Sequence, residues 1–217
     1  MTEKHFFSYG STETDYLSAR DPALKKAIAT IGIIRRPVMP DLFQALVKSI
    51  VGQQISSQAQ ASIWKRLQTK FKPFTPETIA GVSAFQLQAA GITGRKAEYI
   101  QGIAEAVLRG ELDFSKLEAL SDQEVCVQLT KLKGVGNWTA EMFLIFAMQR
   151  PNVLSFGDLA IKRGLRILHG HRKITKQIFR RYQQLYSPYG SVASLYLWAI
   201  AAGALPGLSD PALEPKK

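Results

Sequence analysis

The 217-residue chain contains one cysteine, Cys126, and three scattered histidines, His5, His169 and His171. One cysteine excludes a disulfide framework and any four-cysteine zinc or iron–sulfur site built by this chain. No apolar run reaches the roughly 20 residues that a membrane span needs, and no secretory apolar segment opens the chain. We therefore expect a reduced, intracellular and soluble protein.

Strand patterns are almost absent, because apolar residues recur with helical spacing instead of alternating with polar ones. Thr75-Pro76 is typical of a helix start, Ser121 with Glu124 forms a capping-box pattern, and Trp64 falls on an apolar helix face that predicts a core position. We predict an all-α fold of about ten helices in two lobes with a cleft between them, within one domain spanning residues 1–217. The ends, 1–12 and 205–217, are expected to be loosely ordered. The first expected helix opens at Pro40-Asp41 and has apolar residues at Leu42, Phe43, Leu46, Val47 and Ile50. The other expected helices are 56–71, 76–81, 83–90, 95–108, 122–132, 138–149, 158–168, 176–186 and 189–202.

Acidic residues are scarce, with 17 Asp and Glu against 28 Lys and Arg, for a net charge of +11. Between Glu141 and Asp210 there is one acidic residue, Asp158, among nine basic ones. Such a stretch favours a polyanionic partner, namely DNA, RNA or an anionic membrane, although a merely basic protein is the alternative. The basic residues are spread over several short segments, which favours a groove on a folded domain over a membrane-surface helix.

Two glycines, Gly134 and Gly136, stand in the run Leu132–Ala140 between two expected helices. Glycine allows unusual backbone conformations and close approach of another backbone. The helix that follows begins with outward-pointing amides and the positive end of its dipole, and these features favour binding of a phosphate. Lys133 adds a positive charge beside them. A plain turn between helices is the alternative interpretation of these glycines.

The run Leu132–Ala140 resembles the helix-hairpin-helix element of a large DNA glycosylase superfamily. Members of that superfamily carry a downstream loop that ends in an essential aspartate, and Ser155–Lys162, which contains Asp158, is similar to it. Ser49–Ser56 is similar to the family's Gln-Gln segment, and Ser194–Trp198 to its aromatic-bearing final helix. The resemblance covers about residues 40–203 and implies the helix-hairpin-helix DNA glycosylase fold.

Two positions indicate which branch of the superfamily the chain resembles. Bifunctional glycosylase/lyases carry a lysine where this chain has Trp138, and tryptophan cannot form the Schiff base of the lyase reaction. Branches with a four-cysteine iron–sulfur cluster are excluded by the lone Cys126. The chain most resembles the alkylation-repair branch in its compact form, similar to 3-methyladenine DNA glycosylase II. This resemblance implies a monofunctional hydrolase that needs no cofactor and has no lyase activity.

The resemblance also assigns roles at the reaction centre. Asp158 would be the catalytic residue, stabilising positive charge on the sugar and orienting the attacking water. Trp138 and Trp198 would line a pocket for a cationic alkylated purine, with Met142 and Tyr196 as lesser candidates. In some members of the family an aromatic residue is expected in place of Met142. The alternatives are that Asp158 only caps a helix and that the tryptophans belong to the core.

Binding residues are expected at three places. The hairpin would hold the phosphate backbone, and Gln54 would fill the gap that a flipped nucleotide leaves in the stack. A polar helix start is the alternative for the glutamine pair. Backbone carbonyls of Thr130, Leu132 and Val135 would hold a structural Na⁺ or K⁺ ion, as the resemblance suggests. The DNA-binding candidates are Gln53, Gln54, Ser56, Lys133, Gly134, Val135, Gly136, Lys162 and Arg163.

The expected function is excision of alkylated purines, such as N3-methyladenine and N7-methylguanine, from double-stranded DNA in base excision repair. The protein is expected to act as a monomer, because one flipped nucleotide needs one subunit, and no membrane is involved. One alternative is a non-catalytic protein of the same fold that binds damaged or abasic DNA. The other is a monofunctional glycosylase for another lesion, such as ethenoadenine or hypoxanthine. A helical domain that binds RNA or membranes is more remote.

Overall fold

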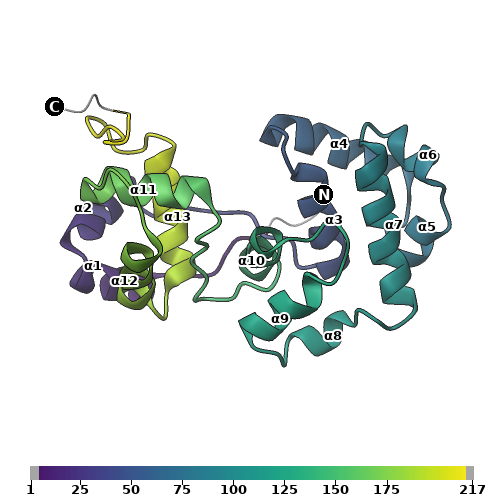
Figure 1. The fold of residues 1–217 in the computed structure, drawn as a ribbon, viewed down its shortest axis with the longest axis horizontal. Coiled ribbons are helices and arrows are strands. Elements are labelled where there is room, and N and C mark those ends of the chain that lie inside the picture. Colours follow the sequence, from purple (N-terminus) through teal and green to yellow (C-terminus); the bar gives the residue numbers. More distant parts are fainter. Residues whose placement is uncertain (1–4, 214–217) are drawn as a thin grey trace. The chain divides into compact units, whose positions relative to one another are not determined.

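The computed structural model describes residues 5–213 and contains thirteen helices over that range. The only strand-like pairing in this part of the chain is an isolated bridge between Phe6 and Pro37. The all-α prediction is therefore confirmed, with three more helices than expected (Figure 1). No helix among these residues is long and apolar enough to cross a membrane.

The chain divides into two compact units, and each is described by itself. Unit 2 is the continuous segment Met39–Met148, whereas unit 1 combines the two outer parts of the chain, 1–38 and 149–217. These units correspond to the two expected lobes, while the single-domain organisation stays a prediction. Unit 2 contains α3 (Leu42–Gly52), α4 (Ser57–Lys70), α5 (Pro76–Ala80), α6 (Ala84–Gln88), α7 (Gly94–Leu108), α8 (Phe114–Leu117), α9 (Asp122–Leu129) and α10 (Asn137–Phe146). Unit 1 contains α1 (Ser11–Arg20), α2 (Pro22–Ile31), α11 (Leu159–His169), α12 (Lys176–Tyr186) and α13 (Gly190–Ala201).

Serine, threonine and aspartate side chains define most helix starts. Ten of the thirteen helices have such an N-cap that accepts a backbone amide, and α1, α10 and α13 do not. The predicted capping box at α9 is present: Glu124 N–H donates to Ser121 Oγ at 3.3 Å, and Ser121 N–H donates to Glu124 Oε2 at 2.8 Å. Thr75 caps α5 with Pro76 at its first turn, as predicted.

Several helix boundaries differ from the prediction. The predicted helix 122–132 ends at Leu129 and the predicted helix 138–149 ends at Phe146, while α1, α2 and α8 were not predicted at all. The sequence of α1 is mostly polar and only Thr14 and Leu17 are buried, so no apolar period marks it. Gln149 has a positive φ of 52°, which does not fit a continuing α-helix.

The core of unit 2 forms around α3, which contacts α4, α7 and α10. Leu46, Val47 and Ile50 of α3 are fully buried, as their helical spacing predicts, and so is Val51. Trp64 of α4 is also buried and meets the Phe74 ring edge-on, with centroids 5.1 Å apart. The prediction that Trp64 belongs to the core is therefore confirmed.

The core of unit 1 forms around α13, which contacts the other four helices of that unit. It approaches α11 most closely where Gly164 lies against Leu197. A Cβ atom at Gly164 would lie 2.9 Å from the carbonyl carbon of Leu197 and closer still to its oxygen. Because these are backbone atoms, only glycine allows α11 and α13 to cross at this distance.

The described parts of both ends of the chain are anchored, unlike the loose ends that we expected. Phe7 is buried and its N–H donates to Arg36 O at 2.9 Å. At the other end, Asp210 is 5% exposed and accepts a 2.8 Å hydrogen bond from Arg166 Nε. The expectation does not hold at these two positions, and residues 1–4 and 214–217 lie outside the described range.

A buried polar network joins α2, α11 and α12 in unit 1. Asp21 Oδ1 caps α2 by accepting from the N–H groups of Ala23 and Leu24. Its other oxygen, Oδ2, accepts from the Tyr186 hydroxyl at 2.7 Å and lies 3.3 Å from His169 Nε2. Burial alone would raise the pKa of Asp21, but the hydrogen bonds from His169 and Tyr186 outweigh it and lower this pKa from 3.8 to about 2.

We expect the Asp21 carboxylate to stabilise unit 1 in a pH-dependent way. Because its pKa is lower in the folded state, this stabilisation is fully present above pH 4 and is lost as the pH falls toward 2. The shift corresponds to about 2 kcal/mol of unfolding free energy. Urea denaturation should therefore show that the stability difference between wild type and Asp21→Asn shrinks by about this amount between pH 5 and pH 2. A difference that is independent of pH would contradict the role of the charge.

Candidate functional site

The segment between α9 and α10 in unit 2 is a tight turn, as its glycines predict. Val135 N–H donates to Leu132 O at 3.1 Å, and the Val135 side chain is buried and anchors the turn. Gly134 has a positive φ of 85° and packs under the ring of Tyr99 from α7. A Cβ at Gly134 would lie 2.6 Å from Tyr99 Cγ and closer to another ring carbon. Both the backbone angle and the packing therefore require glycine at this position.

The start of α10 has the features of an anion-binding helix terminus. Its N-cap is Gly136, which has no side chain to accept the first amides, and its first turn contains no acidic residue. Lys133 is exposed just before this turn. The helix dipole and the amides of the first turn favour a negative group here.

The loop between α3 and α4 is fastened to this turn by Gln53. Its side-chain amide donates to Gly134 O at 2.9 Å and to Thr139 Oγ1 at 3.2 Å. Ser56, another predicted DNA contact, caps α4 by accepting from Ala59 N–H. The side chains of Gln53 and Ser56 thus make hydrogen bonds within the protein. Gln54, in contrast, is exposed and adopts a positive φ of 58°.

Sequence reasoning missed Lys96, which holds the same loop from α7. Its ammonium group donates to Val51 O at 2.8 Å and to Gln53 O at 2.6 Å. Burial lowers the pKa of Lys96. The acceptors are backbone carbonyls more than 40 residues away in sequence, so no sequence signal could have revealed this contact.

Trp138 and Met142 occupy successive turns at the start of α10. Trp138 is 42% exposed, which does not fit the alternative that it is a core aromatic residue. Met142, one turn later, is 6% exposed. The Trp138 side chain is therefore partly exposed at the protein surface, and Met142 is nearly enclosed.

Asp158 of unit 1 is a buried carboxylate at the N-terminus of α11. Its Oδ1 accepts from Ala160 N–H at 2.8 Å and from Ile161 N–H at 2.9 Å, and the residue is 6% exposed. The capping role that sequence left open as an alternative is therefore real. The cap also fixes the orientation of the carboxylate, so it is compatible with catalysis.

The loop that leads into Asp158 is held by aromatic contacts. Phe156 meets the ring of Phe179 edge-on at 5.2 Å, and Lys162 Nζ lies 4.8 Å from the Phe156 ring centroid. Arg163, one residue further, has a half-exposed side chain whose Nε lies 3.8 Å from Asp210 Oδ2. Lys162 and Arg163 thus place two positive charges in the first turns of the helix that Asp158 caps.

The two aromatic candidates on α13 have different environments. Trp198 is half-buried and directly follows Leu197, the residue at the close crossing with Gly164. Tyr196 is fully buried, and its hydroxyl donates to Gly32 O at 3.0 Å. Burial raises the pKa of Tyr196 well above its ordinary value. This environment assigns Tyr196 to the core of unit 1 and corrects its assignment to a pocket wall.

A cation at the hairpin would be held by the backbone carbonyls of Thr130, Leu132 and Val135. The Leu132 carbonyl accepts from Val135 N–H, and a carbonyl oxygen has a second lone pair for an ion. The described residues contain no group of three His, Cys, Asp or Glu side chains that could hold a metal. The backbone site for Na⁺ or K⁺ stays a prediction.

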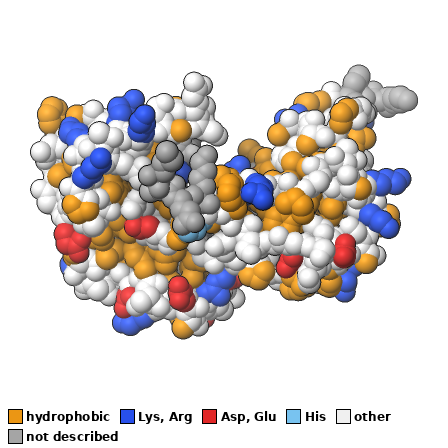
Figure 2. Space-filling view, turned by 180° about the vertical axis from the view of Figure 1, so that it is seen from behind, with side chains coloured by type: hydrophobic (Ala, Val, Ile, Leu, Met, Phe, Trp, Pro, Cys, Tyr) orange, Lys and Arg blue, Asp and Glu red, His pale blue; other side chains and the backbone are white. Residues whose placement is uncertain are grey.

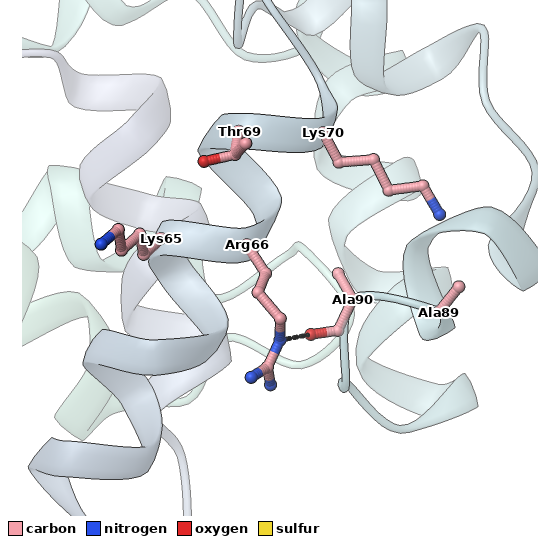
Figure 3. Close-up of a pocket in the computed structure, with 6 residues that line it drawn as sticks. All are labelled: Lys65, Arg66, Thr69, Lys70, Ala89 and Ala90. Atoms are coloured by element: carbon pink, nitrogen blue, oxygen red, sulfur yellow. Dashed lines mark hydrogen bonds between the residues drawn. The ribbon is translucent and has the colours of Figure 1, made fainter.

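A separate surface pocket in unit 2 is lined by cationic side chains that bind backbone carbonyls. It measures about 360 Å³ and contains none of the predicted site residues (Figure 3). Arg66 Nε donates to Ala90 O at 2.8 Å, and Lys70 Nζ donates to Gln86 O at 3.2 Å. These cations stabilise the C-terminal end of α6. The pocket is lined by Lys65, Arg66, Thr69, Lys70, Ala89 and Ala90.

Comparison with known proteins identifies the family. The model of the HhH-GPD superfamily of base excision DNA repair proteins matches residues 47–188, which include the hairpin and Asp158. The chain belongs to the HhH-GPD superfamily. The helix-hairpin-helix glycosylase resemblance stated from the sequence motifs is therefore confirmed.

Among HhH-GPD proteins, this chain is similar to several that are named for 3-methyladenine. It is 32% identical to DNA-3-methyladenine glycosylase 1 of Schizosaccharomyces pombe, covering 84% of each chain. A crystal structure of DNA-3-methyladenine glycosidase from Bacillus halodurans is 38% identical, has a TM-score of 0.80, and the match covers 92% of this chain and 93% of that one. The S. pombe 3-methyladenine DNA glycosylase in complex with abasic DNA is 29% identical with a TM-score of 0.78, covering 87% and 95%.

Proposed function

We propose that this HhH-GPD protein is a monofunctional DNA glycosylase that removes alkylated purines, such as N3-methyladenine and N7-methylguanine, from double-stranded DNA. The observation that carries the proposal is Asp158, a buried carboxylate held by two amides at the start of α11, inside the family match. The relatives named for 3-methyladenine support the substrate class.

Asp158 supplies the electrostatic stabilisation in the proposed reaction. The bond between C1′ and the base nitrogen breaks, and the electron pair leaves with the base, so positive charge builds on the sugar. A carboxylate near C1′ stabilises that charge, and it accepts a proton from the water that adds to C1′. A cationic methylpurine leaves as a neutral base, so no strong general acid is needed and one carboxylate suffices, where glycoside hydrolases use two.

Aromatic faces recognise the flipped base in this proposal. A methylated purine with a positive charge is attracted to the electron-rich face of an indole ring. The exposed Trp138 and the half-buried Trp198 are the proposed ring contacts, with Met142 as an additional apolar wall. An enzyme that selects by charge needs little hydrogen-bonding to the base edge, which suits this set of side chains.

Binding of the duplex is proposed to use the hairpin and the loop after α3. The first turn of α10, with Gly134, Val135 and Gly136 before it and Lys133 beside it, would bind backbone phosphates. Gln54 would occupy the space that the flipped nucleotide vacates, and Lys162 and Arg163 would contact further phosphates. On the face seen in Figure 2, lysine and arginine side chains are distributed over the surface rather than gathered in one continuous patch.

Trp138 stands where lyases of this family carry a lysine, so the protein should hydrolyse the base–sugar bond without cutting the strand. One subunit is sufficient to bind one flipped nucleotide, so we propose a monomer. Its DNA substrate places it in the cytoplasm or nucleoid, or in the nucleus of a eukaryote.

The test is incubation with methylated duplex DNA, followed by identification of the freed bases. We expect release of 3-methyladenine and 7-methylguanine, and no strand cleavage or trapping by borohydride. Untreated duplex is the control, and separate duplexes with ethenoadenine or hypoxanthine test the other lesions. Tight binding to abasic DNA without release of any base would instead indicate a non-catalytic damage-binding protein.

A further inference from the structure

The loop between α3 and α4 is held in its conformation by α7. Lys96, in the first turn of α7, donates to two carbonyls at the end of α3, those of Val51 and Gln53. An ammonium group has three donors and a positive charge, which suits the negative end of a helix dipole. The Lys96 side chain therefore binds the C-terminal end of α3. It also fixes the Gln53 carbonyl group, which directly precedes Gln54.

That following residue, Gln54, has a backbone conformation that needs support. Its φ is 58°, a left-handed value that residues other than glycine adopt rarely, and its side chain is exposed. Such a conformation persists where the surroundings hold it. Gln53 is held at both its carbonyl, by Lys96, and its side chain, by Gly134 and Thr139.

The same face of α7 also supports the hairpin. Tyr99, three residues after Lys96, packs its ring on Gly134. Residues three apart on a helix share a face. One side of α7 thus contacts both the loop that presents Gln54 and the hairpin that precedes α10, and it fixes the two against each other within unit 2.

We infer that Lys96 is a positioning residue for base flipping, which holds Gln54 so that its side chain enters the DNA stack as the damaged nucleotide leaves. The inference rests on the proposed function. Lys96 contacts neither the base nor the sugar and acts through Gln54. Its loss should slow the insertion of Gln54 and leave the chemical step at Asp158 intact.

The main experiment compares Lys96→Met with Arg95→Met. Methionine keeps an unbranched stem and removes the ammonium group, while the neighbouring Arg95 is exposed and its substitution removes the same charge from the same helix turn. On paired methylated duplex we expect the single-turnover rate of Lys96→Met to fall about tenfold or more, since small misplacements of positioning groups have effects of this size. Arg95→Met should match wild type in that rate, and both variants should bind undamaged duplex equally.

A second substrate separates positioning from a general structural defect. When the lesion lies in an unpaired bubble, flipping costs less, so the deficit of Lys96→Met should largely disappear. The ratio of rates on duplex and bubble is internal to each variant and does not depend on the fraction of folded protein. An equal deficit on both substrates, or no deficit on the duplex, would overturn the inference.

A double-mutant cycle tests whether Lys96 acts through Gln54. Gln54→Ala should slow excision from duplex, and adding Lys96→Met should then have little further effect. Additive effects would show that Lys96 acts elsewhere.

If the wild type releases no base, the proposed function fails. The inference is still tested by the fluorescence of 2-aminopurine placed opposite an abasic site: insertion should raise it with wild type and much less with Lys96→Met, and an equal rise would refute the inference.

Discussion

Asp158→Asn is expected to lose excision of methylated purines by about a hundredfold or more, the size of effect seen when a preorganised charge-stabilising group is removed. The asparagine oxygen can still accept the amides of Ala160 and Ile161, because asparagine is as good an N-cap as aspartate. The substitution therefore removes the charge and keeps the cap. Binding to methylated duplex should stay the same or become tighter, since a negative charge is removed near the phosphates.

The control for this variant is another capping aspartate. Asp41 caps α3 in unit 2 by accepting from Gln44 N–H at 2.9 Å, and it has no role in the proposed site. Asp41→Asn should excise methylpurines at the wild-type rate. The measurement is the single-turnover rate of base release for both variants, with thermal melting as the check on folding. An Asp158→Asn protein with the wild-type rate would refute the catalytic assignment.

The candidate site residues that could be predicted from the sequence lie where a local backbone feature and a chemically distinctive residue type occur together. Gly134 and Gly136 predicted a turn between helices. The prediction succeeded because the turn needs a positive φ at Gly134, a conformation that favours glycine. Asp158 was singled out because Ser155–Lys162 resembles the family's aspartate-bearing loop, and because it is the one acidic residue in a basic stretch. The structure adds that capping and burial are both true of this one carboxylate.

The contacts that could not be predicted from the sequence join segments that are far apart in the chain. Lys96 and Gln53 bind backbone carbonyls, which have no sequence signature, and the pairing of Tyr99 with Gly134 joins residues 35 positions apart. Tyr196 shows the converse limit. Its place near Trp198 suggested a pocket residue, but α13 is buried on all sides from Gly190 to Leu197, and the Tyr196 hydroxyl donates to Gly32 O.

The close crossing of α11 and α13 explains how unit 1 holds Asp158 and Trp198 at a fixed separation. Asp158 caps α11 and Trp198 directly follows Leu197 on α13, so the crossing at Gly164 determines how the two residues are arranged. No side chain separates the helices at this point. A change of a few tenths of an ångström here would move the Asp158 carboxylate, whose proposed catalytic effect depends on its position.

Gly164→Ala is therefore expected to destabilise the protein and to slow excision together. Its methyl group would overlap the Leu197 carbonyl, which belongs to a helix backbone and cannot rotate away. Overpacking of this kind costs about 1–3 kcal/mol of unfolding free energy. The rate should fall beyond what the loss of folded protein explains, because α11 would be displaced from α13. Urea denaturation and single-turnover excision, measured on the same preparations, check both effects.

Gly102→Ala is the matched control, because it makes the same substitution inside a helix, α7, where nothing lies within 4 Å of the new Cβ. Alanine has the higher helix propensity, so this variant should gain up to about 1 kcal/mol of stability and keep the wild-type excision rate. The two glycines thus separate the backbone effect of alanine from the effect of the crossing. If Gly164→Ala were as stable and as active as Gly102→Ala, the α11–α13 contact would not be what positions Asp158.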